Sequence, residues 1–314
     1  LSAIYFAQLC EEAGVPDGVV NIVLGAGATG SALASNPDLD KIAFTGSSRT
    51  GQAIMAAAAK NTTKVSLELG GKSPVIIDKS ANIPVAARRV AWGKWLNAGQ
   101  TCVAPDYVLV DETVQDAFVD ALRTSLIDFY GENPHTSDSY GRIVSPRHFD
   151  RLVSLMSGGT PIIGGESSAA DRYIAPTVLG NVSLQSALMN EEIFGPLLPI
   201  IGIKNTAEAI QFITERDHPL ALYVFAEKSS VIEEVLDRTT AGGVTVNGTL
   251  LHLTSPHLPF GGVGESGMGA YHGVSGVRVF QHMKPVLKRG TKIDPKLPYP
   301  PYTERKLKLF RKVL

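Results

Sequence analysis

The sequence predicts an α/β protein built around a parallel sheet. Continuous apolar runs of strand length alternate with helical segments along most of the 314 residues, as where residues 41–46, KIAFTG, precede the Ala-rich residues 51–60. Strands that are apolar throughout are typical of parallel sheets covered by helices on both faces. A chain of this length is too long for one ordinary core, which indicates two domains.

The first part of the chain begins with a helical pattern at residues 1–13 that ends at Gly14, because glycine commonly follows the last helical residue. Beyond it, apolar runs predict strands and runs of small residues predict helices. The strands are expected at 19–25, 41–46, 65–70 and 73–78, and the helices at 29–35 and 51–60.

The second part of the chain continues in the same way. A helix is expected at 84–97, and a second at 114–130 with one apolar stripe of Val114, Ala117, Phe118, Ala121, Leu122, Leu126 and Phe129. Further strands are expected at 106–112, 172–179, 197–203, 220–226 and 242–248. Residues 295–314 are Pro-rich and then basic and amphipathic, which is typical of a surface arm; contact with lipid is the alternative.

Composition and charge limit the possible partners and compartment. Apolar residues make up 44% and charged residues 19%, and the net charge of −1 gives no basic excess to attract nucleic acid or acidic lipid. Two cysteines without metal-ligand spacing favour a reducing cytoplasm. No apolar run approaches the ~20 residues that span a bilayer. Leu1 lies directly in a helical pattern, which indicates a chain cut from something longer.

Two glycine loops are candidates for binding a dinucleotide. Residues 25–30, GAGATG, match G-x-G-x-x-G, but the next strand ends at Gly46 without the acidic residue that binds ribose hydroxyls, so a tight turn is favoured. Residues 46–51, GSSRTG, offer backbone N–H groups and hydroxyls at a helix N-terminus, which suits a pyrophosphate. A capped helix without a ligand is the alternative for this second loop.

A third loop, residues 68–74, places Glu68 at the end of an apolar strand. Because burying an unpaired carboxylate is costly, we expect Glu68 to face a cleft, and the two following glycines let a ligand approach the backbone.

Cys102 follows a predicted helix in residues 97–105, NAGQTCVAP. A lone cysteine is more often a small apolar core residue, and this is the interpretation of Cys10.

Four motifs together resemble the aldehyde dehydrogenase superfamily: VSLELGGKSP at 65–74, NAGQTCVAP at 97–105, NEEIFGP at 190–196 and LPFGGVGESGMG at 258–269. Their order and spacing are far more specific than any one of them. GQTCVAPDYVL, RYIAPT and GMGAYHG resemble the class 3 branch, which includes fatty-aldehyde dehydrogenases. The resemblance covers essentially the whole chain. It implies part of a Rossmann-type cofactor domain at 1–70, an α/β catalytic domain at 71–269 and a C-terminal oligomerisation arm at 270–314, which partly returns to the cofactor domain.

The resemblance implies roles for individual residues. Cys102 matches the catalytic nucleophile, Glu68 matches the general base, and Phe260 matches a wall of the substrate tunnel. Residues 25–30 fall near the adenine side of the cofactor. The residues that the resemblance assigns to cofactor binding are Gly46, Ser47, Ser48 and Gly51 at the pyrophosphate, Leu69, Glu192 at the nicotinamide ribose, and Phe194 near the nicotinamide.

The earlier half of the family pattern has no counterpart in this sequence. That half carries an asparagine that helps to hold the oxyanion, and a lysine and a glutamate that hold the adenosine ribose. Removing one oxyanion-hole donor typically lowers the rate by ~10²–10³. We therefore expect residues 1–314 alone to be weakly active or inactive.

The chemistry implied by the resemblance is NAD(P)-dependent oxidation of a medium, long or aromatic aldehyde to a carboxylic acid, without a metal. A cysteine thiolate forms a thiohemiacetal and then a thioester, and a carboxylate helps water to attack that thioester. The presence of Glu68 favours water over coenzyme A as the acyl acceptor. The alternatives are a CoA-acylating dehydrogenase and an inactive fragment or assembly subunit. A homodimer is the expected assembly.

Overall fold

The computed structural model describes residues 1–313 and divides the chain into two compact units, residues 1–280 and 281–314. The first unit contains every predicted site residue. In the described part of the second unit, the regular element is helix α11 (Glu304–Val313), and Lys306 Nζ donates a hydrogen bond to the Tyr299 carbonyl at 2.7 Å. The domain boundaries expected near residues 70 and 269 stay a prediction.

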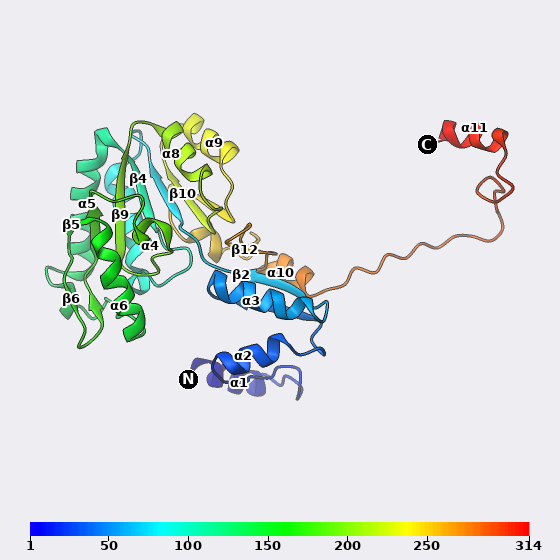
Figure 1. The fold of residues 1–314 in the computed structure, drawn as a ribbon, viewed down its shortest axis with the longest axis horizontal. Coiled ribbons are helices and arrows are strands. Elements are labelled where there is room, and N and C mark those ends of the chain that lie inside the picture. The colour runs from blue at the N-terminus through cyan, green and yellow to red at the C-terminus, as the bar shows by residue number, and fades with distance from the viewer. Residues whose placement is uncertain (314) are drawn as a thin grey trace. The chain divides into compact units, whose positions relative to one another are not determined.

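The larger sheet of the first unit has seven strands (Figure 1). Neighbouring strands are parallel, except that the edge strand β5 runs antiparallel to β8. Parallel strands buried on both faces explain the continuous apolar runs in the sequence. The order of the strands is β11 (Gly243–Val246), β10 (Ala221–Phe225), β3 (Pro74–Ile77), β4 (Tyr107–Asp111), β9 (Leu197–Ile203), β8 (Thr177–Gly180) and β5 (Thr160–Ile163).

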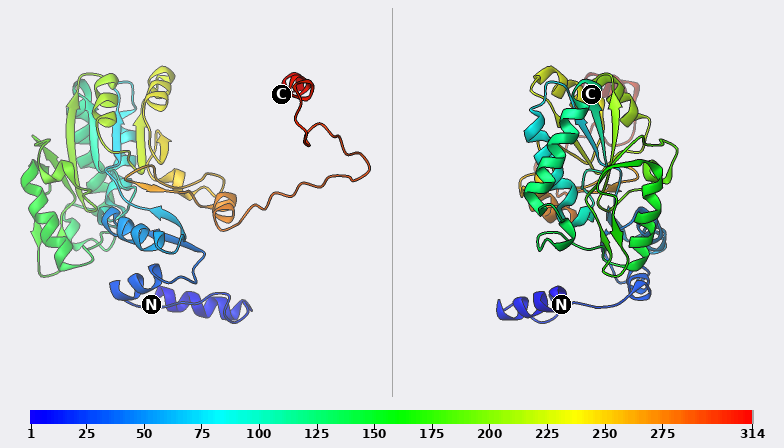
Figure 2. Two further views of the ribbon diagram at one scale, coloured as in Figure 1. Left: turned by 45° about the vertical axis from the view of Figure 1, so that its right-hand side comes forward. Right: turned by 90° about the vertical axis from the view of Figure 1, so that its left-hand side faces the viewer.

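Helices cover both faces of this sheet (Figure 2). Val75 and Ile77 of β3 pack with α4 (Ile83–Trp95) and α5 (Gln115–Tyr130), whereas Ile76 packs with α8 (Thr206–Thr214) and α9 (Ser229–Arg238). The predicted stripe of α5 lies at the first of these cores, where Phe118, Leu122 and Leu126 are buried. Apolar residues on both sides of each strand therefore have a core to enter.

A smaller sheet joins β1 (Lys41–Thr45), β2 (Lys64–Glu68) and β12 (Gly267–Met268). β1 and β2 are parallel and β12 is antiparallel to β2, so that Thr45, Glu68 and Gly267 lie at the same level. The remaining elements of this unit include α1 (Ser2–Glu12), α2 (Gly27–Ala34), α3 (Ser48–Ala59), α6 (Pro146–Leu155), β6 (Ser167–Ser168), β7 (Tyr173–Ile174), α7 (Ala187–Asn190) and α10 (Gly273–Val279).

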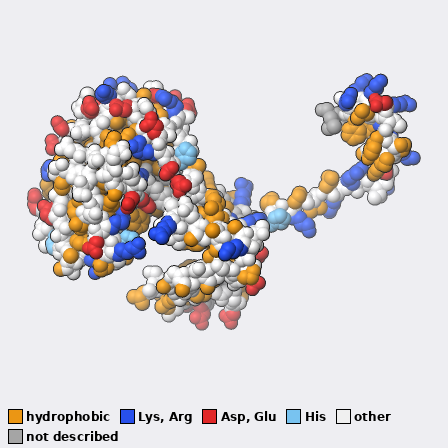
Figure 3. All heavy atoms as spheres, viewed as in Figure 1, with side chains coloured by type: hydrophobic (Ala, Val, Ile, Leu, Met, Phe, Trp, Pro, Cys, Tyr) orange, Lys and Arg blue, Asp and Glu red, His pale blue; other side chains and the backbone are white. Residues whose placement is uncertain are grey.

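Two strand predictions were wrong. Residues 19–25 form no strand, and within the described chain no strand pairs with them; Val19, Val23 and Leu24 are more than 60% exposed. An apolar run becomes a strand only where a neighbour bonds to its backbone. Apolar side chains are correspondingly visible at the surface around α1 and α2 (Figure 3). The strand expected at 172–179 is divided into β7 and β8 around Pro176, which has no N–H to donate.

Candidate active site

Glu68 is the last residue of β2 and its side chain is buried, with only 1% of its surface exposed. Among the described residues, neither carboxylate oxygen has a hydrogen-bond partner. Burial raises the pKa of this carboxyl group to about 8. The group is therefore mostly protonated near neutral pH, and it can exchange a proton with whatever enters beside it. We expected Glu68 to face a cleft, but its carboxylate is buried, and it lines neither of the two cavities described below.

Cys102 lies in a turn that follows α4. The helix ends at Trp95, and Asn97 and Ala98 take left-handed backbone angles with φ of 53° and 52°. The Gln100 side chain connects the turn to the backbone of residues 142–144. It donates a hydrogen bond to the Arg142 carbonyl at 3.0 Å and accepts one from the Val144 N–H at 2.9 Å.

Strand β10 supports the peptide next to the thiol. The Tyr223 hydroxyl donates to the Val103 carbonyl at 2.6 Å, and Tyr223 is buried in the sheet. The Ala104 N–H donates to the Thr101 carbonyl at 2.9 Å and closes the turn around Cys102. The thiol is thus held by bonds to its neighbours' backbone and is itself partly exposed.

The electrostatic environment of Cys102 disfavours the thiolate. Burial raises the pKa of the thiol to about 11, and the negative charges of Glu68 and Glu192 add to this rise. The backbone N–H groups of Cys102 and Val103 oppose it by bonding to the sulfur. The two carboxylates therefore act on the thiol, although they come from distant parts of the sequence. A base or an added cation is needed to form the thiolate near pH 7.

Glu192 lies in the segment before β9, half-buried beside the glycines that follow Glu68. A Cβ atom on Gly70 would collide with its carboxylate, and the Gly71 N–H donates a hydrogen bond to it. Burial and the Asp106 carboxylate raise its pKa to about 7, against the opposing effects of Gly71 and two nearby cations. The preceding Glu191 is exposed.

The glycine loop at residues 46–51 forms the N-terminus of α3. Ser47 is the N-cap and its hydroxyl accepts from the Thr50 N–H at 3.4 Å, while the Ser48 hydroxyl donates to the Glu265 carbonyl at 3.2 Å. The hydroxyls are thus used within the protein, and the first N–H groups of the helix remain to bind an anion. Gly51 packs on Leu69, whose side chain a Cβ at Gly51 would meet at 2.5 Å.

A cavity of about 550 Å³ lies between the N-terminus of α3 and Glu192; Glu68 and Cys102 do not line it. Ser48, Gly71 and Glu192 line it together with Lys72 and Glu265. Its volume falls within the range of about 300–1,000 Å³ that is usual for ligand sites. A helix N-terminus, glycines that permit close approach and a carboxylate on one cavity suit the phosphate and ribose groups of a dinucleotide, so the residues present fit NAD(P).

The aromatic residues predicted at the site differ in burial. Phe194 has a left-handed φ of 46° and is 37% exposed, whereas Phe260 is 6% exposed. Phe260 exchanges backbone hydrogen bonds with Tyr271, at 2.8 Å each, and stacks on His272 at 5.1 Å between ring centroids. Trp95, considered above only as part of a helix, is buried and donates to the Pro196 carbonyl at 2.9 Å.

The structure adds Tyr271, which the sequence interpretation had not selected. Its hydroxyl lies 3.5 Å from the Thr45 hydroxyl. Burial raises its pKa and the Thr45 bond lowers it, while the charges of Glu68 and Cys102 raise it further. Tyr271 is therefore part of the same group. The sequence signal for it was its position in GMGAYHG, next to a glycine-rich loop.

Residues 25–30 do not complete a dinucleotide fingerprint. The structure gives no strand before them, and α2 begins at Gly27 with an N-cap, Ala26, that makes no side-chain capping bond. A Cβ at Gly25 would overlap the Thr29 side chain. These contacts support the turn interpretation, and the proposed position near the adenine stays a prediction.

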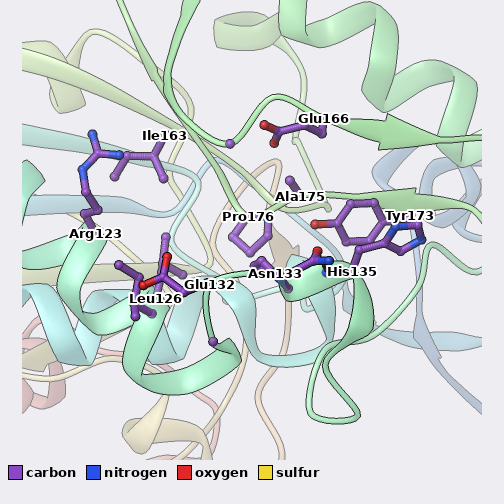
Figure 4. Close-up of a pocket in the computed structure, with 14 residues that line it drawn as sticks. Arg123, Leu126, Glu132, Asn133, His135, Ile163, Glu166, Tyr173, Ala175 and Pro176 are labelled. Atoms are coloured by element: carbon purple, nitrogen blue, oxygen red, sulfur yellow. Dashed lines mark hydrogen bonds between the residues drawn. The ribbon is translucent and has the colours of Figure 1, made fainter.

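A second cavity, of about 500 Å³, is lined by none of the predicted site residues (Figure 4). Its apolar wall includes Leu126, Ile163 and Pro176, and Figure 4 shows charged groups of both signs around it.

Over residues 1–313, no helix has the length and apolar character needed to cross a membrane. The same residues contain no group of three or more His, Cys, Asp or Glu side chains arranged to hold a metal ion.

Comparison with known proteins identifies the family. The sequence pattern of the aldehyde dehydrogenase family matches residues 1–286, and the chain belongs to this family. It is 50% identical over 270 residues to aldehyde dehydrogenase family 3 member A2 of Rattus norvegicus, covering 85% of this chain and 56% of that protein. It is also 50% identical over 264 residues to the dimeric NADP-preferring aldehyde dehydrogenase of Mus musculus, covering 83% and 58% of the two chains. The chain spans a little over half the length of these curated relatives.

Solved structures confirm the predicted fold. AldH of Staphylococcus aureus in its substrate-bound state has a TM-score of 0.92 and 43% identity, and the match covers 99% of this chain and 68% of that one. The NAD-dependent aldehyde dehydrogenase of Sinorhizobium meliloti has a TM-score of 0.87 and 32% identity, with 94% and 60% covered. The resemblance to class 3 enzymes is likewise confirmed by the family 3 relatives.

Proposed function

We propose that this protein oxidises an aldehyde to a carboxylic acid with NAD⁺ or NADP⁺, through a thiohemiacetal and a thioester on Cys102. The observation that carries the proposal is that the Glu68 carboxylate, which has no hydrogen-bond partner among the described residues, lies close enough to Cys102 for its charge to raise the pKa of the thiol. The family membership supports the reaction class. The names of the relatives, one NADP-preferring and one NAD-dependent, support a nicotinamide cofactor.

Cys102 begins the proposed reaction by attacking the aldehyde carbon. The thiol proton must leave first, and the fraction of Glu68 that is ionised near neutral pH can take it. The backbone N–H groups of Cys102 and Val103, which bond to the sulfur in this structure, are available to stabilise negative charge at the same place. When bound, the cofactor accepts the hydride that the substrate carbon gives up. Cys102 then carries a thioester.

Hydrolysis of the thioester is the step assigned to Glu68. A carboxylate with a pKa of about 8 can take the proton of an attacking water, and help of this kind is worth ~10²–10⁴ in rate. Glu192 and the N-terminus of α3 hold the cofactor, with Gly46, Gly51, Leu69 and Phe194 shaping its site. Phe260, among aromatic rings, suits a medium, long or aromatic aldehyde.

We further propose that residues up to about 70 serve cofactor binding and residues 71–269 serve catalysis. Residues 270–314 form the subunit arm of a homodimer, as the name of the dimeric relative suggests. The two free cysteines favour a reducing compartment, the cytoplasm.

Alkylation of Cys102 by iodoacetamide tests the proposed function directly. Aldehyde plus NAD⁺ or NADP⁺ should protect Cys102 from alkylation, as measured by mass spectrometry of its peptide. Cys10 should react equally with and without these ligands and serves as an internal control. Equal alkylation of Cys102 with and without these ligands would contradict the proposal and favour a subunit without catalytic activity.

A further inference from the structure

The segment that carries Glu192 is held by charged side chains that have no role in the proposed reaction. Lys72 Nζ donates to the carbonyls of Leu188 at 2.9 Å and Glu191 at 2.8 Å, and it also pairs with the Asp106 carboxylate. Lys72 lies four residues after Glu68 in the same loop. One ammonium group therefore connects the loop of the general base to the segment of Glu192.

Asp106 binds the backbone of the same segment through its carboxylate. Its second carboxylate oxygen accepts from the Ile193 N–H at 2.9 Å, and Asp106 is 3% exposed. Its own N–H donates to the Ser73 carbonyl at 2.8 Å, so the residue is fixed between the starts of β3 and β4. A buried carboxylate with a cation and an N–H donor makes strong, charge-assisted bonds.

Arg151 holds the segment from a different element, α6. Its guanidinium donates to the Glu192 carbonyl at 3.1 Å and to the Ile193 carbonyl at 2.6 Å. Two cations from separate elements thus bind the carbonyls of four residues, Leu188, Glu191, Glu192 and Ile193. Such use of cations exceeds what a short helix and turn need, because ordinary loops satisfy most carbonyls with water or backbone.

We propose that Lys72, Asp106 and Arg151 are positioning residues that hold the backbone at 188–193, so that the Glu192 carboxylate is presented to the cofactor from a fixed place against Gly70 and Gly71. This inference rests on the proposed function only in naming the cofactor as the ligand of Glu192. Residues that orient the ligands of a metal site typically contribute about 10–100-fold to binding, and we expect an effect of similar size here.

The first measurement needs no cofactor. Hydrogen exchange of peptides covering 188–196 is compared in the parent protein, Arg151→Met, and Lys72→Met combined with Asp106→Asn, which avoids leaving a buried carboxylate unpaired. We expect faster exchange at Ile193 in both variants. Matched controls are Lys79→Met, an exposed lysine just after β3, and Arg147→Met, one turn before Arg151 on α6 and also exposed. These controls should exchange as the parent does.

The second measurement asks whether the network acts through Glu192. Calorimetric Kd values for NAD⁺ and NADP⁺ should rise about ten-fold in both network variants. In a Glu192→Gln background, Arg151→Met should raise the Kd by less than about a further two-fold. If Arg151 acts through the Glu192 carboxylate, the effects of the two substitutions are not additive. A merely structural role would weaken binding equally in both backgrounds.

The outcomes separate this inference from the proposed function. Unchanged exchange at 188–196 together with parent-like Kd values overturns the positioning role, as does a fully additive effect in the Glu192→Gln background. A parent protein that binds neither NAD⁺ nor NADP⁺ overturns the proposed function and the ligand named for Glu192. Hydrogen exchange then still decides whether Lys72, Asp106 and Arg151 hold the backbone at 188–193: faster exchange in the variants supports this and unchanged exchange rejects it.

Discussion

Glu68 and Glu192 are two buried carboxylates beside one thiol, and they differ in how the protein holds them. Both have pKa values raised by burial, to about 8 and about 7. Glu192 accepts a bond from the Gly71 N–H and sits on a segment fixed by Lys72, Asp106 and Arg151. Glu68 has no hydrogen-bond partner in the described part of the chain.

This difference teaches that a raised pKa does not by itself distinguish a proton carrier from a binding group. An unbonded carboxylate keeps all its lone pairs for water or substrate, whereas a bonded and anchored one has a fixed direction. In the proposed function, proton transfer accordingly belongs to Glu68, which has no bonding partner, and ligand positioning to Glu192, which is anchored.

The largest expected effect on the rate of aldehyde oxidation comes from replacing Cys102, whose thiol is influenced by both carboxylates. Cys102→Ser should lower aldehyde oxidation by about 10⁴-fold or more, because the alkoxide of serine is far less accessible than a thiolate and leaves an acyl group less readily. NAD(P)H formation at 340 nm measures it. Cys10→Ser should be as active as the parent; a loss shared by both variants would point to misfolding instead.

Replacing the unbonded carboxylate comes next. Glu68→Gln should lower steady-state turnover by ~10²–10⁴ while the first turnover still occurs, because the thioester forms and is not hydrolysed. A burst of NAD(P)H and an acylated Cys102 peptide in mass spectrometry would show this. Normal turnover would mean that water is not the acceptor, and added coenzyme A would then be tested as the alternative.

Replacing the anchored carboxylate should have a smaller and different effect. Glu192→Gln should weaken cofactor binding about ten-fold without accumulating acylated Cys102, since its role is to hold a ligand. Calorimetry and the same peptide analysis measure both quantities. If acylated Cys102 accumulates in Glu192→Gln and not in Glu68→Gln, the two roles assigned here are reversed.

The last effect is on the free energy of unfolding and on how it depends on pH. Glu68 has a folded pKa of about 8 against an ordinary value of 4.5, so the unfolded chain releases this proton first and stability falls as pH rises from about 4.5 to 8. Glu68→Gln should be more stable than the parent by as much as about 5 kcal/mol at pH 9 and nearly equal to it at pH 4. Urea unfolding at both pH values tests this; an equal difference at both would exclude linkage to Glu68.

Continuous apolar runs were sufficient to predict β3, β4, β9 and β10, because strands buried on both faces need no alternation. Residues 19–25 have the same composition and form no strand, since strand formation also depends on a partner that local sequence does not specify. Helices α6, α8 and α9 were not predicted at all. Their apolar residues do recur at helical spacing, as Phe149, Leu152 and Leu155 do in α6, so the signal was present in the sequence and was missed.

The candidate site divides in a similar way. Cys102, Glu68 and Glu192 were assigned their roles from the resemblance of their local motifs to those of the aldehyde dehydrogenase superfamily, and these roles stay predictions. Lys72 was visible within ELGGKSP, but its partners at Leu188, Glu191 and Asp106 are far away in sequence. Tyr223 and Tyr271 were missed for the same reason.

Local sequence was thus enough for most of the alternation of strands and helices and, through its motifs, for the family, since these depend on residue type and short spacing. Tertiary structure decided which carboxylate is left without a partner, which is anchored, and how strongly both suppress ionisation of the thiol. Burial and charge act through space over a few ångströms, and the groups that exert them lie more than 30 positions apart along the chain.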